Sequence, residues 1–175
     1  MSKHRGMKDM RRSIRSLLTA AALAAVTIPV SSAAAQNPRA GAPRTPFGTP
    51  DLAKVKWLEG SWTGTAEGES SIYQRFKFVN DSTVEITYYR DSAFGQSSGD
   101  GRLYLSVGRI YHTFGSNRWV ATRIGDQGLY LVPQSTARAN FAWTYVSPDA
   151  WTFTMRTGVG GREHVTIYNM KRVGT

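Results

Sequence analysis

Two histidines, His112 and His164, carry the side chains best suited to metal binding or proton transfer in the sequence after residue 35. Cysteine is absent, which excludes disulfides, thiolate zinc sites and thiol nucleophiles. No third ligand is spaced to complete a metal site with the two histidines, and no carboxylate pair or Ser–His–Asp set stands out. We therefore expect His112 to be a partly exposed residue packed between its neighbours, and we expect binding in place of catalysis.

Three further polar residues interrupt or extend apolar alternation. Arg90 follows the alternating apolar residues of 84–88, and Arg123 follows those of 119–121. At the mouth of a cavity, either arginine could hold a carboxylate or phosphate in a bidentate pair; alternatively, both reach solvent at strand ends. Gln74 breaks an otherwise apolar face and would need a hydrogen-bond partner if it were buried.

The elements that must position these residues are short strands. From Gly60 onward, runs rich in β-branched and aromatic residues are divided by Gly, Asn, Asp and Pro, which is typical of strands joined by tight turns. The exception is the longer segment 92–101, which we expect to be a loop at an open end or a lid. The sequence predicts eight to ten strands, at 61–67, 70–79, 83–91, 102–107, 109–114, 118–124, 128–134, 139–147, 150–157 and 163–173.

Alternation along these runs indicates that each strand buries one face. A series of antiparallel hairpins with no long helix must remove its two edge strands, and closure into a barrel does so. We therefore predict an all-β fold, a single antiparallel up-and-down β-barrel of about 8–10 strands. A short N-terminal helix is expected to precede it, beginning at Asp51 as the N-cap and ending at Gly60.

The first 35 residues differ in composition from the rest of the chain. Six basic residues precede the apolar run 16–30, and small residues up to Ala35 follow it, which is the order found in signal peptides. A membrane anchor is the alternative, but the run is shorter than the roughly 20 residues that span a bilayer. We expect a signal peptide at 1–35, a Pro-rich linker at 36–50 and one barrel domain at 51–175, in an exported protein of the periplasm or the extracellular space.

Charge argues against a nucleic-acid partner. Of the 22 Lys and Arg and the 12 Asp and Glu residues, six basic and one acidic residue lie in 1–35. Removal of that segment reduces the net charge from +10 to +5, so half of the apparent basicity is lost.

A barrel of about eight strands either is filled by side chains or holds one small ligand. The chain has seven Phe, eight Tyr and five Trp, which fit a packed core or an aromatic cavity. We predict a cavity for a small apolar or amphipathic molecule, entered near 92–101; a filled barrel acting as an envelope interaction protein is the alternative. The candidate ligand-binding residues, chosen by alternation, are Phe76, Tyr88, Arg90, Leu105, Arg123, Phe141, Trp143 and Phe153.

An outer-membrane barrel is a further alternative. Several predicted strands have about six residues, fewer than the nine to eleven needed to cross a bilayer, and charged residues alternate on their outward faces. These features disfavour a membrane span after residue 35.

Gly60, Ser61 and Trp62 open the first predicted strand, and Arg172 lies near the end of the last. This G-x-W with a last-strand arginine resembles the lipocalins and the wider calycin group. The longer pattern W-L-x-G-x-W at 57–62 is similar to secreted bacterial lipocalin-like domains. The resemblance implies that Gly60, Trp62 and Arg172 form a structural motif, in which Arg172 stacks on Trp62 across the closed end of the barrel.

The opening also resembles nitrobindin, a haem-binding barrel. Gly60, Trp62, Gly64 and Gly68 match its G-x-W-x-G-x-x-x-G pattern, and its axial histidine lies in the last strand, as His164 does here. His164 and Arg172 are separated by an even number of residues, so an unbroken strand directs both to one face. The resemblance implies, as an alternative, haem b with His164 as the axial ligand.

Overall fold

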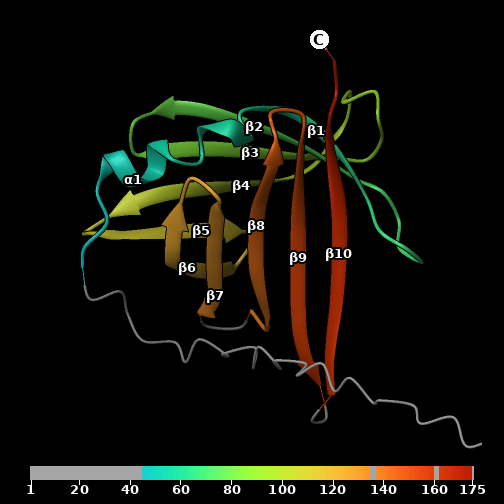
Figure 1. The fold of residues 1–175 in the computed structure, drawn as a ribbon. Coiled ribbons are helices and arrows are strands. Elements are labelled where there is room, and N and C mark those ends of the chain that lie inside the picture. The colour runs from blue at the N-terminus through green and yellow to red at the C-terminus, as the bar shows by residue number, and fades with distance from the viewer. Residues whose placement is uncertain (1–44, 135–136, 160–161, 175) are drawn as a thin grey trace, which may run out of the picture. The chain divides into compact units, whose positions relative to one another are not determined.

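The fold is a closed barrel of ten antiparallel strands, described by a computed structural model for residues 45–134, 137–159 and 162–174 (Figure 1). Each strand pairs with its neighbours in sequence, and β1 pairs with β10 to close the sheet. The strands are β1 (Gly60–Thr65), β2 (Ile72–Asn80), β3 (Thr83–Tyr89), β4 (Ser97–Ser106), β5 (Arg109–Phe114), β6 (Asn117–Gly125), β7 (Gly128–Gln134), β8 (Ala139–Ser147), β9 (Ala150–Val159) and β10 (Arg162–Arg172).

The predicted all-β, up-and-down barrel is therefore confirmed, and all ten predicted strands are present. The largest difference is at β4, which begins at Ser97, five residues earlier than expected. The predicted loop 92–101 is accordingly shortened to the turn at 90–96, between β3 and β4. The stretch 97–101 lacks apolar alternation, and pairing of Ser97–Gly101 with β3 makes it a strand.

The short helical segment before β1 plugs one end of the barrel. It consists of α1 (Thr49–Ala53) and the 3-10 turn η1 (Lys56–Leu58). Leu52, Val55 and Leu58 are fully buried and belong to the same apolar core as the inward faces of the strands. We call this end the plugged end and the opposite end, where β1, β3, β5, β7 and β9 finish, the rim.

The helix begins three residues earlier than predicted, and Asp51 is not its N-cap. Gly48 occupies that position, and Pro50 lies in the first turn, where its missing N–H costs no helical hydrogen bond. Asp51 still satisfies an exposed donor of the helix start, because its Oδ2 accepts the Gly48 N–H at 2.9 Å. This hydrogen bond and the Lys54 side chain both hold the pKa of Asp51 below its ordinary value, the Lys54 contribution being the larger.

The turn at 90–96 folds onto the outside of the barrel. The Phe94 ring packs edge-on against Tyr89 and Tyr73, with centroid distances of 5.0 and 6.2 Å, and the Arg75 guanidinium lies over the same rings. Tyr73 and Arg75 lie on the outward face of β2, and Tyr89 lies on the outward face of β3. Their contacts hold the turn against the outer wall at the rim.

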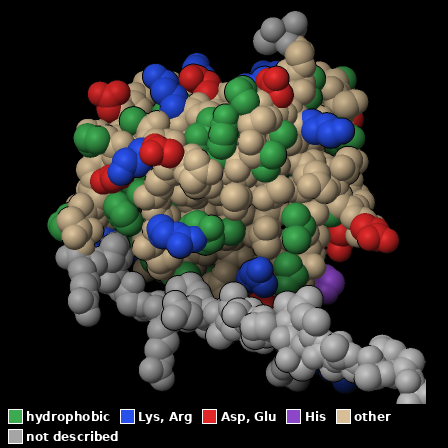
Figure 2. Space-filling view, viewed as in Figure 1, with side chains coloured by type: hydrophobic (Ala, Val, Ile, Leu, Met, Phe, Trp, Pro, Cys, Tyr) green, Lys and Arg blue, Asp and Glu red, His purple; other side chains and the backbone are tan. Residues whose placement is uncertain are grey.

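Charges of both signs are interspersed on the face shown in Figure 2, with hydrophobic side chains scattered between them. In the part of the chain that the structure describes, no helix has the length and hydropathy to cross a membrane. The signal peptide predicted at 1–35 and most of the linker predicted at 36–50 lie outside the described residues, as does the start of the predicted leader-free chain at Gln36.

Candidate functional site

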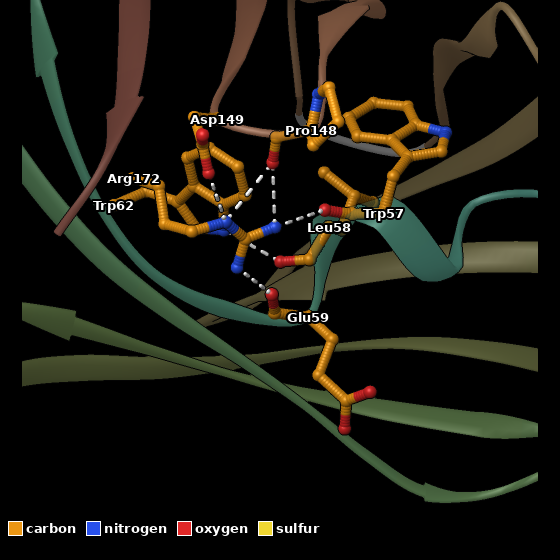
Figure 3. A network of polar contacts seen from close by, with 7 residues as sticks. All are labelled: Trp57, Leu58, Glu59, Trp62, Pro148, Asp149 and Arg172. Atoms are coloured by element: carbon orange, nitrogen blue, oxygen red, sulfur yellow. Dashed lines mark hydrogen bonds and ion pairs between the residues drawn. The ribbon is translucent and has the colours of Figure 1, made fainter. Parts of the chain in front are cut away.

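The plugged end is sealed by Arg172 (Figure 3). Its guanidinium carbon lies 4.2 Å from the Trp62 ring centroid, the stacking that the lipocalin resemblance implies. The same group donates to Glu59 O at 2.6 Å, to Trp57 O at 3.2 Å and to Pro148 O at 2.9 Å. One planar side chain thus donates hydrogen bonds to backbone carbonyls of two segments that lie far apart in sequence. These segments are η1 with the residue after it, and the β8–β9 turn.

Gly60 is required for this seal. Its φ is +120°, a conformation that L side chains rarely adopt, and a Cβ there would collide with Arg172 Nη1. Trp62 is fully buried, and its Nε1 donates to Leu58 O at 2.7 Å. The three residues of the motif therefore fix one end of the barrel, and their roles are structural.

On the rim side of this seal, aromatic rings fill the inside of the barrel. Two of the predicted wall residues, Phe76 and Trp143, are 2% and 3% exposed and pack edge-to-face at 5.6 Å. Both also contact Trp151, which in turn packs against Trp62. Phe76 and Trp143 therefore belong to the packed core and form a floor, below any ligand that enters from the rim.

Leu105 also lies away from the rim. It is near the end of β4, and its backbone N–H donates to Ser82 O in the β2–β3 turn. That turn is at the plugged end, so Leu105 lies at the end of the barrel opposite the rim. Alternation correctly gave the inward face of the strand but carried no information on depth in the barrel.

Three other predicted wall residues line the half of the barrel nearer the rim and are only partly buried. Phe141 stacks on Trp119 with a centroid distance of 4.6 Å, and Phe153 stacks on Tyr168 at 5.9 Å. Tyr88 packs on Phe114 at 4.5 Å. Burial raises the pKa of the Tyr88 phenol, so this hydroxyl stays protonated at neutral pH.

Of the two arginines considered for the mouth, Arg123 points away from the interior and Arg90 is exposed after the end of β3. Arg123 lies on the outer face with its guanidinium 3.7 Å from the Tyr130 centroid, because a β-bulge between Ala121 and Arg123 inserts one residue and reverses the alternation. The expectation of an inward Arg123 is therefore wrong.

His112 is 2% exposed, so the prediction of a partly exposed residue is also wrong. It shares the inward face of β5 with Ile110, and its ring lies between Trp119, at 5.2 Å, and Trp143, at 5.3 Å. Burial among these rings lowers the pKa of His112 to about 4, although its Nδ1 lies 3.3 Å from Arg102 O. His112 is therefore neutral at physiological pH.

His164 lies at the rim, on the same face of β10 as Thr166, Tyr168 and Arg172. The pairing of β10 with β9 is unbroken from 162 to 171, so the alternation persists along the strand. His164 is exposed, and its Nε2 lies 3.3 Å from the Thr166 hydroxyl. The structure does not bring His164 and His112 together, and among the described ranges no group of three or more His, Cys, Asp or Glu side chains can hold a metal ion.

Gln74 is 6% exposed and lies on the inward face of β2 between register partners Trp62 on β1 and Tyr88 on β3. Its Oε1 is buried, and no hydrogen bond to it is formed within the described residues. The indole nitrogens of Trp57 and Trp151 are likewise buried without a hydrogen bond in the described residues. An unpaired buried amide oxygen costs about 1–3 kcal/mol, and Gln74 carries the unpaired acceptor of this group.

Sequence analysis missed Phe114, which packs against Tyr88 at the rim and is 38% exposed. It shares the alternation of Ile110 and His112, a signal that pointed to an inward side chain. Gly99 and Gly101 on β4 lie beneath these two rings: a Cβ on Gly99 would be 3.0 Å from Phe114 Cε2, and one on Gly101 would be 3.3 Å from Tyr88 Cε2. The glycines thus leave the wall of β4 flat under the two rings.

A hollow lies outside the barrel, at the plugged end. It is an open groove of about 330 Å³ between α1 and the end of β2. Its lining mixes apolar and charged side chains: Thr49, Pro50, Ala53, Lys56, Phe78, Asn80 and Asp81. It is separate from the rim and contains none of the predicted ligand-binding residues.

No protein family and no curated protein sequence matches this chain. Two solved structures resemble it as barrels. A redesigned beta barrel is 15% identical, with a TM-score of 0.37 and coverage of 69% of this chain and 96% of that chain. EF1p2_mFAP2b bound to DFHBI is 12% identical, with a TM-score of 0.35 and coverage of 69% of this chain and 97% of that chain. At these identities and TM-scores, neither match carries an argument about function.

Proposed function

We propose that the barrel binds a small apolar or amphipathic molecule through its rim and does not catalyse a reaction. The observation that carries the proposal is the contrast between the two ends of the barrel. The plugged end is filled by α1 and η1 and sealed by Arg172, whereas among the described elements no helix covers the rim.

Several inward side chains near the rim are apolar and only partly buried. They include Phe114, Phe141, Phe153 and Met155, which come from strands on both sides of the barrel. Partly exposed aromatic rings converging on one end of a barrel are suited to the burial of an apolar ligand. Gln74 and Tyr88 supply the few polar groups that such a site needs to orient its ligand.

The test is the binding of N-phenyl-1-naphthylamine, an uncharged dye whose fluorescence rises in apolar surroundings, to the full chain. We expect saturable binding, and we expect Thr157→Trp to weaken it at least tenfold. Thr157 is the register partner of His164 and shares its inward face at the rim, so an indole there obstructs entry. Thr154→Trp is the matched control, because Thr154 lies on the outward face of the same strand.

No saturable binding to the unmodified chain would contradict the proposal and favour the filled barrel. Equal weakening by the inward and outward tryptophans would contradict entry at the rim.

A second candidate function is haem binding through His164. It is supported by the position of this imidazole on the inward face of β10 at the rim, where it is exposed. Bound haem would supply a ferric iron for which a neutral imidazole nitrogen is a suitable ligand, once Nε2 leaves the Thr166 hydroxyl. The residues therefore fit an axial ligand.

Ferric haem added to the full chain tests this candidate. Haem binding through His164 gives a shifted Soret band that is lost in His164→Ala and kept in His112→Phe, since His112 is buried beneath aromatic rings. A band that is absent, or indifferent to His164, contradicts it.

We also propose that the protein is exported. The proposal is supported by the order of basic, apolar and small residues in 1–35. Expression of the full chain in a bacterium and mass spectrometry of the product test it: export predicts a chain beginning at Gln36 outside the cytoplasm, and an uncleaved cytoplasmic chain contradicts it.

A further inference from the structure

The polar groups inside the barrel near Gln74 restrict the chemistry of its ligand. Gln74 is 94% buried, and its Oε1 has no hydrogen-bond donor among the described residues. A carbonyl oxygen accepts hydrogen bonds and donates none. A ligand that reaches Gln74 therefore binds more tightly if it carries an O–H or N–H group. A hydrogen bond from this group to Gln74 Oε1 removes the free-energy cost of the unpaired buried acceptor.

The described polar side chains at this depth are uncharged. Tyr88 is the register partner of Gln74, and burial raises the pKa of its phenol; His112 is neutral because burial lowers its pKa to about 4. Arg123, one of the two arginines considered for the ligand site, lies on the outer face of the barrel, and Arg90 is exposed to solvent after the end of β3. Because a buried anion needs a nearby cation, these surroundings disfavour a carboxylate or phosphate at Gln74.

A cation does approach the interior at the rim. Arg162 shares the inward face of β10 with His164, but both are exposed at the start of the strand. His164 and Arg162 precede Tyr168 on β10 by four and six residues, so they lie beyond the rings of the apolar core. An anionic group could reach them only by remaining in solvent at the mouth.

The walls around Gln74 favour a flat ligand. The Tyr88 and Phe114 rings pack at 4.5 Å over the glycines of β4, and Phe141 stacks on Trp119. Phe114 is the exposed member of the first pair, at 38%. A planar molecule that replaces the Phe114 ring against Tyr88 retains the aromatic contact and approaches Gln74 along a wall with no side chains on Gly99 and Gly101.

We propose that the ligand is an uncharged, planar aromatic molecule that enters past Phe114 and donates a hydrogen bond from a hydroxyl or amino group to Gln74 Oε1. The inference rests on the proposed binding function. It adds the charge, the shape and the polar group of the ligand, none of which that function requires.

Three probes of one shape test it on the full chain at pH 7: 2-naphthol, 2-methoxynaphthalene and 2-naphthoate. The first carries an uncharged donor, the second replaces it by an ether oxygen, and the third carries an anion. Binding is followed by isothermal calorimetry. We expect 2-naphthol to bind about tenfold more tightly than either of the others, the effect of one buried hydrogen bond.

The variant Gln74→Leu removes the acceptor and replaces the amide side chain by an apolar one of similar size. In this variant we expect the preference for 2-naphthol over 2-methoxynaphthalene to fall to within twofold. Gln127→Leu is the matched control, since Gln127 is exposed in the β6–β7 turn at the plugged end, and it should keep the tenfold preference. Circular dichroism verifies that each variant is folded.

A measurement on the unmodified protein removes any dependence on the variant. We expect the side-chain amide resonances of Gln74 in NMR spectra to shift on addition of 2-naphthol and not of 2-methoxynaphthalene.

The outcomes separate the two proposals. If neither N-phenyl-1-naphthylamine nor any of the three probes binds, the proposed binding function fails; if the dye binds and none of the three probes does, the inference about Gln74 is overturned. If the probes bind without preference, if 2-naphthoate binds most tightly, or if the Gln74 resonances do not respond to 2-naphthol, binding stands and the inference about Gln74 is overturned.

Discussion

Arg172 and Trp62 are register partners across β1 and β10, and the guanidinium of one lies 4.2 Å from the indole of the other. The two strands are the first and last of the barrel, so this contact lies on the seam where the sheet closes. It also joins the seam to the helical plug, because Trp62 donates to Leu58 and Arg172 donates to the carbonyls of Trp57 and Glu59. Closure of the barrel and sealing of its end thus depend on the same pair.

Removal of the indole tests the seam. Trp62 is fully buried, so Trp62→Ala leaves a large cavity, and we expect the free energy of unfolding to fall by about 3–5 kcal/mol. Urea denaturation followed by circular dichroism measures the change. An unchanged midpoint would show that Trp62 does not hold the closed end.

The planar shape of Arg172 gives a second prediction. Arg172→Lys keeps the charge but loses the planar guanidinium, which donates hydrogen bonds to three carbonyls. We expect the free energy of unfolding to fall by about 2 kcal/mol. Asp149→Asn is the control: this carboxylate pairs with Arg172 at 3.3 Å but is 80% exposed, so we expect less than about 1 kcal/mol. Similar losses in both variants would mean that charge, and not shape, is decisive.

His112 predicts a dependence of stability on pH. Burial lowers its pKa to about 4 in the folded protein from an ordinary value of 6.5, so as the pH falls the unfolded chain takes up this proton first. The stability contributed by neutral His112 is therefore present above pH 6.5 and is lost as the pH falls from 6.5 toward 4. The loss is up to about 3 kcal/mol.

Comparison of variants isolates this effect from the titration of carboxylates. We expect His112→Phe to remove the decline between pH 6.5 and 4, and His164→Ala, at an exposed position, to retain it. Urea denaturation at a series of pH values provides the measurement, and a profile of His112→Phe that parallels the unmodified chain would refute the assignment.

The glycines of β4 predict a steric effect. A Cβ at Gly101 would lie 2.5 Å from the carbonyl oxygen of Thr113, a backbone atom that cannot move without distorting the β4–β5 pairing. We expect Gly101→Ala to reduce the melting temperature, at a cost of about 2 kcal/mol. Gly95→Ala is the control, because nothing lies within 4 Å of its added methyl group, and it should change stability by less than about 0.5 kcal/mol. Equal melting temperatures would argue against a tight wall at Gly101.

The strands could be predicted because their signals are local. Alternation, β-branched residues and turn residues each act over a few positions, and all ten strands were found within a few residues of their ends except at β4. Ser97–Gly101 carry no such signal, and their strand conformation comes from pairing with β3, a tertiary contact.

The candidate site was only partly predictable. Neither the depth of an inward residue along the barrel nor the position of a β-bulge is determined by the few residues around it. Leu105 and Phe141 both face inward, yet one lies at the plugged end and the other nearer the rim, a difference that register across the barrel determines. The bulge before Arg123 cannot be recognised from alternation alone. That Gln74 faces inward followed from its strand; that its oxygen has no partner depends on every residue packed around it.

The seam between β1 and β10 also governs the order in which the chain can fold. Every other strand pair joins neighbours in sequence, whereas the hydrogen bond from Arg172 to Trp57 spans 115 positions. Hairpins from β1 to β9 can form during synthesis, but the sheet then has two unpaired edges, at which foreign strands can add. Only the arrival of the final strand pairs both edges at once, so we expect a nascent or truncated chain that lacks β10 to be prone to aggregation.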